Sequence, residues 1–185
     1  TLRADGNKAV VAVHTEVEGD PGAEVRHELL DADGTVVARG GTEFEVPQPK
    51  LWSVDAPHLY TLRTMVRSGG RVVDMVKTRV GLRMLTFDNR TGFHLNGVPM
   101  KLKGVCEHAD GGPLGSAFPR KLLRERLELL KQIGCNAIRT AHNPRTRDFY
   151  DLCDELGIMV MDEIFDGWHK KADADYGARF FAEWW

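Results

Sequence analysis

The spacing of hydrophobic residues changes its period near residue 84 of this 185-residue chain. Before that point, short runs alternate apolar and polar residues and are rich in β-branched side chains, which predicts strands. Glycine-containing turns at residues 31–34 and 68–70 separate pairs of such runs and predict two β-hairpins. Short strands at this spacing, with no helical period between them, predict a β-sandwich of the immunoglobulin-like kind over residues 1–84.

After residue 84, strand-like and helix-like segments alternate. The pair Asn96-Gly97 lies between apolar residues and predicts a tight hairpin. Helices are predicted over residues 119–134 and 143–157, each with a proline in its first turn and a glycine at its C-terminal end, and Asn143 is the predicted N-cap of the second. The apolar stripe of the first helix is predicted to consist of Leu123, Leu127, Leu130 and Ile133.

Strands are predicted at residues 101–106, 136–140 and 158–161, and a third helix at 180–185. This order of strands and helices predicts a parallel sheet with right-handed crossovers over residues 85–185. An eight-stranded barrel needs about 250 residues. The segment therefore predicts either a small doubly wound domain or the first part of a barrel.

The composition excludes several classes of function. A formal net charge of −2 lacks the basic excess of nucleic-acid-binding proteins, and no apolar run reaches the ~18 residues of a membrane span, so we expect neither partner. The chain begins with Thr1 and without a signal peptide, as expected of a piece of a longer protein, so the sequence assigns no compartment. The cysteines Cys106, Cys135 and Cys153 lack Cys-x-x-Cys spacing and are expected to be buried thiols.

Polar residues collect where the predicted parallel strands end. His108 follows the first strand, Arg139 and His142 end the second, and Asp162 and Glu163 end the third. Because the carboxyl ends of parallel strands form the ligand face of α/β sheets, these side chains predict a ligand site. Structural interpretations remain open. His108 could be a loop residue bonded in the turn at Gly111-Gly112, and Arg139 could pair with a neighbouring carboxylate. His142 could cap the next helix, and Asp162 could anchor the loop that follows.

Two chemistries fit these residues. Histidines with a carboxylate could hold a metal ion, as in barrel hydrolases, but Cys106-Glu107-His108 lacks a second histidine on the same strand face. Alternatively, histidine and arginine donors with a carboxylate acceptor bind the hydroxyl groups of a carbohydrate. Trp168 is then either a stacking face for the sugar or a core residue.

A longer pattern resembles a known family. Residues 136–144, with the sequence NAIRTAHNP, resemble the N-x-x-R-x-x-H-x-P signature of glycoside hydrolase family 2, the group of β-galactosidases, β-glucuronidases and β-mannosidases. Residues 161–163 are similar to the Asp-Glu that ends the third barrel strand of that family. Residues 93–105 resemble the beginning of its barrel, and residues 51–60 and 80–83 resemble its immunoglobulin-like domain.

The resemblance implies an immunoglobulin-like sandwich at residues 1–84, followed at residues 85–185 by the first three βα units of a TIM (β/α)8 barrel. The two catalytic glutamates of the family follow barrel strands four and seven, so no catalytic residue is expected up to Trp185.

The resemblance also implies which residues bind sugar. His108, Arg139 and His142 would line the subsite for the nonreducing sugar, supported by Asp162 and Glu163, and Trp168 joins them as a substrate-binding candidate. Some β-galactosidases of the family hold magnesium through a glutamate and a histidine just beyond these residues. His169 matches that histidine, but Gly167 stands at the place of the carboxylate, so neither a metal site nor a cofactor is expected.

The sequence is therefore interpreted as an internal fragment of a retaining, β-galactosidase-like glycoside hydrolase. The parent protein is expected to hydrolyse terminal β-glycosidic bonds in oligosaccharides and to form a homo-oligomer, and the fragment itself to be inactive. The alternatives are a noncatalytic carbohydrate-binding or structural module and a metal-dependent barrel hydrolase.

Overall fold

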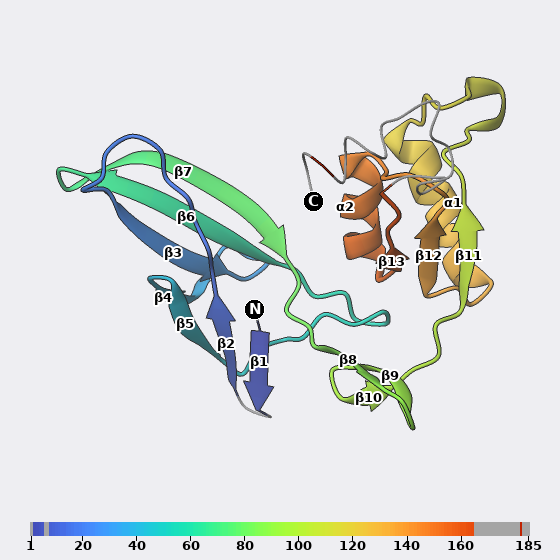
Figure 1. Ribbon diagram of the computed structural model, residues 1–185, viewed down its shortest axis with the longest axis horizontal. Helices are drawn as coiled ribbons and strands as arrows, with labels where there is room; N and C mark the ends of the chain where they lie inside the picture. The colour runs from blue at the N-terminus through green and yellow to red at the C-terminus, as the bar shows by residue number, and fades with distance from the viewer. Residues whose placement is uncertain (1, 6–7, 165–181, 183–185) are drawn as a thin grey trace. The chain divides into compact units, whose positions relative to one another are not determined.

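The computed structural model describes residues 2–5, 8–164 and 182 of the chain (Figure 1). The chain divides into two compact units, Thr1–Lys101 and Leu102–Trp185, and each is described separately.

The described residues of the first unit up to Val80 form two antiparallel sheets. One sheet has the strand order β1-β2-β5 and the other the order β4-β3-β6-β7. The strands of the first are β1 (Leu2–Asp5), β2 (Lys8–Ala12) and β5 (Glu43–Pro47). Those of the second are β3 (Glu24–Leu30), β4 (Val36–Gly40), β6 (Tyr60–Ser68) and β7 (Arg71–Val80). The pairs β3–β4 and β6–β7 are the two hairpins that the turn residues predict.

Buried residues from both sheets form one core. Ala9 and Val46 of the first sheet pack in the same cluster as Leu29 and Tyr60 of the second, together with Leu82 just after β7. The two sheets therefore face each other as a β-sandwich, which confirms that part of the predicted architecture.

A small antiparallel sheet follows the sandwich within the first unit. Its strands are β8 (Leu85–Asp88), β9 (Gly92–Leu95) and β10 (Val98–Pro99). The hairpin between β9 and β10 turns at Asn96 (φ 53°) and Gly97 (φ 79°), as the tight turn predicted from this pair requires. Asn96 also links this sheet to the sandwich, because its Nδ2 donates to the Trp52 carbonyl and its Oδ1 accepts from the Met84 amide, both at 2.9 Å.

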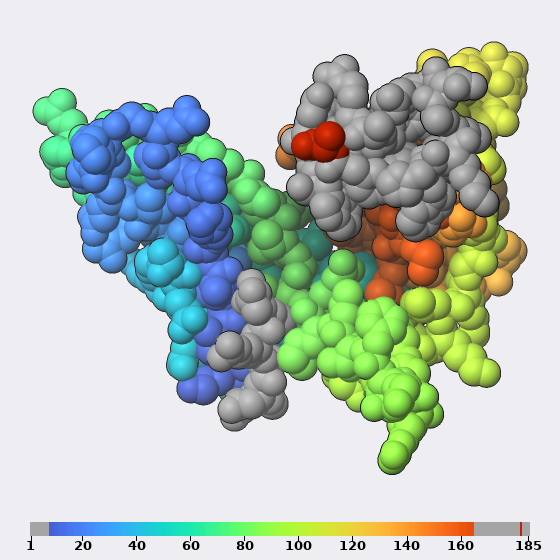
Figure 2. Space-filling model, in the orientation of Figure 1, coloured from blue at the N-terminus to red at the C-terminus, as the bar shows by residue number. Residues whose placement is uncertain are grey.

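The segment between β2 and β3 is bonded to the end of the β6–β7 hairpin. This segment lies against the β6–β7 hairpin (Figure 2), and Ser68 Oγ donates to Asp20 Oδ2 at 2.5 Å. That bond, with the Gly22 amide, holds the pKa of Asp20 below its ordinary value. The carboxylate at this end therefore remains ionised near neutral pH.

The second unit contains a parallel sheet with the strand order β11-β12-β13. Along the chain its elements are β11 (Gly104–Glu107), the short 3₁₀ helix η1 (Gly112–Leu114), α1 (Arg120–Gln132), β12 (Ala137–Thr140), α2 (Arg147–Leu156) and β13 (Met159–Met161). The described residues thus form two complete βα units and a third strand. The predicted helix at 180–185 lies, apart from Ala182, outside the described residues. No described helix has both the length and the apolar character that crossing a membrane requires.

Both helices cover the same face of this sheet. Ile138 of β12 packs in one cluster with Leu123 and Leu127 of α1 and with Phe149 and Leu152 of α2. The apolar stripe predicted for α1 therefore packs in the core, except for Ile133, which is 76% exposed. Ile133 is the residue that caps the C-terminus of α1, so its side chain no longer follows the helical stripe.

Both predicted helix starts are wrong, by one residue for α1 and by several for α2. Pro119 is the N-cap of α1 and not its first residue, because its backbone is extended and its carbonyl already accepts the amide of Leu123 at 3.1 Å. The cap of α2 is Thr146 and not Asn143. Residues 143–145 form a loop instead, for a reason that lies in the contacts of Arg145 described below.

The expectation of three buried thiols is also only partly right. Cys153 is buried in the core, and burial raises the pKa of its thiol to about 12. Cys135 is half-buried and Cys106 is exposed, and all three are free. Cys106 is exposed because Val105, its neighbour on β11, points to the helix-covered face and Cys106 therefore points to the other.

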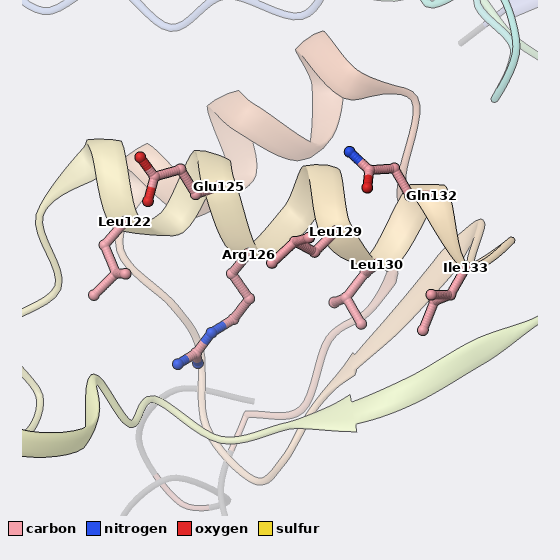
Figure 3. A pocket seen from close by; sticks show the side chains of 7 residues that line it. All are labelled: Leu122, Glu125, Arg126, Leu129, Leu130, Gln132 and Ile133. Atoms are coloured by element: carbon pink, nitrogen blue, oxygen red, sulfur yellow. The ribbon is translucent and has the colours of Figure 1, made fainter.

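The flank of α1 that faces away from α2 carries an open groove of about 460 Å³ (Figure 3). Its apolar lining includes Leu129, which is 60% exposed, and Ile133. The opposite flank of α1 is joined to α2 by ion pairs from Arg120 and Arg124 to Glu155. The described residues thus pack α1 on one flank only.

The first parallel strand has no room for a side chain at Gly104. A Cβ there would lie 2.8 Å from the carbonyl oxygen of Ala137 on β12. We expect Gly104→Ala to lower the free energy of unfolding by about 1–3 kcal/mol, because the two strands must separate. Gly41→Ala is the control, since a Cβ there meets no atom within 4 Å. Urea denaturation compares both with the wild type, and equal midpoints would contradict the close approach.

Candidate functional site

The alternation of side chains divides the parallel strands into two faces. Val105, Ile138 and Val160 are in register across β11, β12 and β13 and pack against the helices. The residues that follow each of them point to the opposite face. Arg139 is therefore flanked there by its register partners Cys106 and Met161.

At the carboxyl ends of the strands, this second face carries a connected set of side chains. Arg139 Nε donates to Glu163, whose other oxygen, Oε2, lies 2.6 Å from His142 Nδ1. Arg139 Nη1 also contacts Cys106 Sγ at 3.4 Å. The ring of His108 meets that of His142 edge to face, with 5.6 Å between centroids. We call these five residues the Arg139 cluster.

The charges of the Arg139 cluster stabilise each other. The hydrogen bond from His142, and then the one from Arg139, hold the pKa of Glu163 below its ordinary value. The contacts with Cys106 and Glu163 raise the pKa of Arg139. Arg139 and Glu163 are therefore a charged pair at neutral pH. The cluster brings together four of the predicted site residues, His108, Arg139, His142 and Glu163.

Asp162 points away from this cluster. Its Oδ1 accepts hydrogen bonds at 2.8 Å from Thr140 Oγ1 and from the hydroxyl of Tyr150 on α2. The Thr140 hydroxyl oxygen in turn accepts the backbone amide of Glu163 at 2.8 Å. Burial raises the pKa of Tyr150, so its hydroxyl remains a donor. Asp162 thus anchors the end of β13 to the helix-covered face through Thr140 and Tyr150. The loop that it was expected to anchor lies, after Ile164, outside the described residues.

A buried ion pair lies on the helix-covered face of the sheet, behind the Arg139 cluster. The sequence interpretation missed it. The side chain of Glu107 is 8% exposed and accepts from Arg126 Nη1 at 2.9 Å and from Arg145 Nε at 3.1 Å. Arg145 also donates to the carbonyls of Glu107, Ala141 (3.1 Å) and Asn143 (3.0 Å). The only signal in the sequence is that Glu107 shares the strand face of Val105.

These contacts explain why α2 begins late. Residues 141–145 form a loop around the Arg145 guanidinium, which donates hydrogen bonds to the carbonyls of Ala141 and Asn143. A helix that started at Asn143 would point these carbonyls in other directions. The loop carries His142 at the end of β12, three residues before Arg145, and its Ala141–His142 peptide bond is cis. His142 is therefore not a helix cap. Trp168 and the residues of the magnesium comparison, Gly167 and His169, lie outside the described residues.

Within the described part of the chain, no group of three or more histidine, cysteine, aspartate or glutamate side chains is arranged to hold a metal ion. In the Arg139 cluster the carboxylate is shared with a guanidinium, whose charge opposes a cation. The chemistry of the cluster is that of hydrogen-bond donors and acceptors around one ion pair, which suits a ligand with many hydroxyl groups.

Two family models match the chain. The model "Glycosyl hydrolases family 2" matches residues 1–83, and "Glycosyl hydrolases family 2, TIM barrel domain" matches residues 88–171. Together with the fold, these matches define a segment of a glycoside hydrolase in which a β-sandwich precedes the start of a TIM barrel. The chain belongs to glycosyl hydrolase family 2.

Curated relatives and solved structures agree with this assignment. A protein of Formosa agariphila, provisionally named a beta-glucuronidase, is 46% identical over 195 residues, covering 100% of this chain and 19% of that protein. A beta-galactosidase of Bacteroides ovatus is 41% identical, covering 100% of this chain and 24% of the relative. The chain thus spans about a fifth to a quarter of the length of these relatives.

Among solved structures, a beta-glycosidase from Bacteroides vulgatus superposes with a TM-score of 0.86 at 37% identity, covering 100% of this chain and 25% of that one. A β-glucuronidase from Ruminococcus gnavus in complex with D-glucuronic acid gives a TM-score of 0.82 at 31% identity, covering 88% of this chain and 28% of that one.

The buried ion pair predicts a large effect of one arginine. Arg145→Met keeps the apolar stem but leaves Glu107 buried with Arg126 as its remaining charged partner. We expect the free energy of unfolding to fall by about 3–5 kcal/mol. Arg147→Met is the matched control, because Arg147 is 91% exposed and faces Asp151 at 3.8 Å, so its loss should cost under about 0.5 kcal/mol. Urea denaturation that showed equal losses would refute the supporting role of Arg145.

The lowered pKa of Glu163 predicts a dependence of stability on pH. Its contribution is present above the ordinary carboxyl pKa of 4.5 and is lost as the pH falls through the lower pKa of the folded state. Between pH 7 and pH 3, we therefore expect the wild type to lose more stability than Glu163→Gln, so that the two unfolding curves approach each other. Parallel losses measured by urea titration at each pH would show that Glu163 is not stabilised as an anion.

Proposed function

We propose that the protein containing this chain hydrolyses terminal β-glycosidic bonds in oligosaccharides, with a β-galactosidase-like activity. The observation that carries the proposal is the Arg139 cluster at the carboxyl ends of β11, β12 and β13, in a chain of a glycoside hydrolase family. A β-glucuronidase activity is the second candidate, because a relative 46% identical to this chain and a solved structure 31% identical to it carry that name.

In this proposal the cluster binds the nonreducing sugar. Imidazoles and a guanidinium offer donors and acceptors on one face, and sugar hydroxyls can meet both. His108 and His142 provide the ring edges, and Arg139 and Glu163 provide the charges that orient them. Asp162 would support the site from the helix side, and Trp168 would be a stacking face for the sugar, which is one of the two interpretations left open for it.

The proposed organisation follows the sequence boundaries. Residues 1–84 would form the immunoglobulin-like domain, and residues 85–185 the first three βα units of the barrel, with the sheet β8–β10 as the lead into it. The matched ranges 1–83 and 88–171 support this division, whereas the compact units separate after Lys101. The homo-oligomeric state remains a prediction.

The reacting carboxyl groups are proposed to come from outside the described residues. A retaining glycosidase needs two carboxyl groups about 5–5.5 Å apart, one of them an acid with a raised pKa. Asp162 and Glu163 point to opposite faces, and the pKa of Glu163 is lowered. This chain would therefore bind and orient the sugar, while a carboxylic acid elsewhere protonates the glycosidic oxygen and a carboxylate attacks the anomeric carbon. No cofactor is proposed.

Turnover of aryl β-glycosides tests the proposal. The full-length protein should release the aryl group from a β-galactoside or a β-glucuronide, and His142→Ala should lower kcat/KM by roughly 10²–10⁴, as when a hydrogen bond made in the transition state is lost. His14→Ala is the control, because that side chain is 86% exposed in the first unit. Wild-type kinetics of His142→Ala would remove the cluster from the sugar site, and turnover of neither glycoside would reject the activity.

A further inference from the structure

His142 Nδ1 lies near two groups of opposite hydrogen-bonding character. Glu163 Oε2, which can only accept when ionised, is 2.6 Å away. Arg139 Nη2, which can only donate, is 3.4 Å away. The contact with Glu163 is the nearer one and is charge-assisted, so it determines the tautomer of the ring. We infer that the ring proton is on Nδ1 and is donated to Glu163.

Glu163 is itself held in the form that this bond requires. Its second oxygen accepts from Arg139 Nε, and the contacts with His142 and Arg139 keep it ionised at neutral pH. The backbone amide of Glu163 is fixed by Thr140, a fully buried residue. Both the carboxylate and its backbone are thus anchored before any ligand arrives, which makes Glu163 a rigid partner for the imidazole.

We propose that Glu163 is a positioning residue that fixes the tautomer of His142, so that His142 Nε2 accepts a hydrogen bond from one hydroxyl group of the sugar. A neutral imidazole with its proton on Nδ1 has its lone pair on Nε2. No described residue supplies a hydrogen bond to Nε2, and the side chain of His142 is 40% exposed. The inference rests on the proposed function. It adds which partner donates the hydrogen bond between His142 and the sugar.

The direction of this hydrogen bond matters because a hydroxyl group can both donate and accept. The protein must therefore decide in which direction the bond is made, and a fixed tautomer does so. If Glu163 acts in this way, its own contribution to binding passes through His142. A direct contact between Glu163 and the sugar would instead be independent of the imidazole.

A double-mutant cycle in the full-length protein separates these two roles. With an aryl β-glycoside that the protein turns over, we expect Glu163→Gln to lower kcat/KM about 10–100-fold, because an amide offers Nδ1 both a donor and an acceptor. In the His142→Ala background the same change should cost less than about threefold. Losses that multiply in the double variant would overturn the proposal.

The cycle has a matched control. Asp148→Asn also removes a carboxylate that pairs with an arginine of the same unit. That pair, Asp148 and Arg120 at 3.0 Å, joins α1 to α2 and is not part of the Arg139 cluster. The kcat/KM of this variant should equal that of the wild type. Glu163→Gln preserves the size of the side chain, and kcat/KM is measured well below the unfolding temperature of the variant, so that a loss of activity reports on the hydrogen bond and not on folding.

Sugar analogues test the direction of the bond. Monodeoxy and monodeoxyfluoro forms of the product sugar serve as competitive inhibitors, because fluorine can accept a hydrogen bond weakly but cannot donate one. At one ring position both analogues should lose affinity alike, by about 10-fold, and His142→Ala should abolish that loss. A fluoro analogue that keeps the affinity the deoxy analogue loses, in a His142-dependent way, would show that Nε2 donates and would overturn the inference.

The outcomes distinguish this inference from the proposed function. Absence of turnover with both glycosides overturns the proposed function and the inference together. Turnover that is insensitive to His142→Ala removes the imidazole from the sugar site. Turnover that depends on His142, with a multiplicative cycle or a donating Nε2, leaves the proposed function intact and overturns the positioning role of Glu163 alone.

Discussion

The organisation of the second unit depends on one geometric constraint, the alternation of side chains along three parallel strands that are in register. Val105, Ile138 and Val160 share one face and are covered by helices, so the residues next to them must share the other. The same rule separates two carboxylates that are adjacent in sequence. Asp162 meets Tyr150 on the helix side, whereas Glu163 meets Arg139 and His142 on the opposite side.

The two faces of the sheet carry different kinds of polar contact. On the helix side, Glu107 is buried between Arg126 and Arg145, and Arg145 gathers the carbonyls of the loop that carries His142. A buried ion pair gains little over an apolar core, but losing one partner is costly, so it enforces one loop conformation. On the other side, the side chains are partly exposed and charged and remain available to a ligand.

The Arg139 cluster also shows how an ion pair orders neutral groups. The hydrogen bonds from His142 and then from Arg139 keep Glu163 ionised, and in our proposal the ionised Glu163 determines which ring nitrogen of His142 carries the proton. In the proposed sugar site such ordering would set the direction of the hydrogen bond, because a hydroxyl group can either donate or accept. The exposed thiol of Cys106 lies beside the same guanidinium, at 3.4 Å, and belongs to this arrangement.

The sequence by itself determined the order of the elements, the hairpins, the β-sandwich and the residues at the strand ends, because these depend on local periodicity and turn chemistry. Asn96-Gly97 turns where the pair predicts, and Leu123 and Leu127 are buried where their spacing predicts. The resemblance of residues 136–144 to a family signature added the hypothesis that these residues bind sugar. Tertiary structure decided the rest: Arg145 reaches Glu107 from 38 positions away and thereby delays α2, and no local pattern encodes that contact. Likewise, that Glu163 faces Arg139 and Asp162 faces α2 follows only when three distant strands pair in one register.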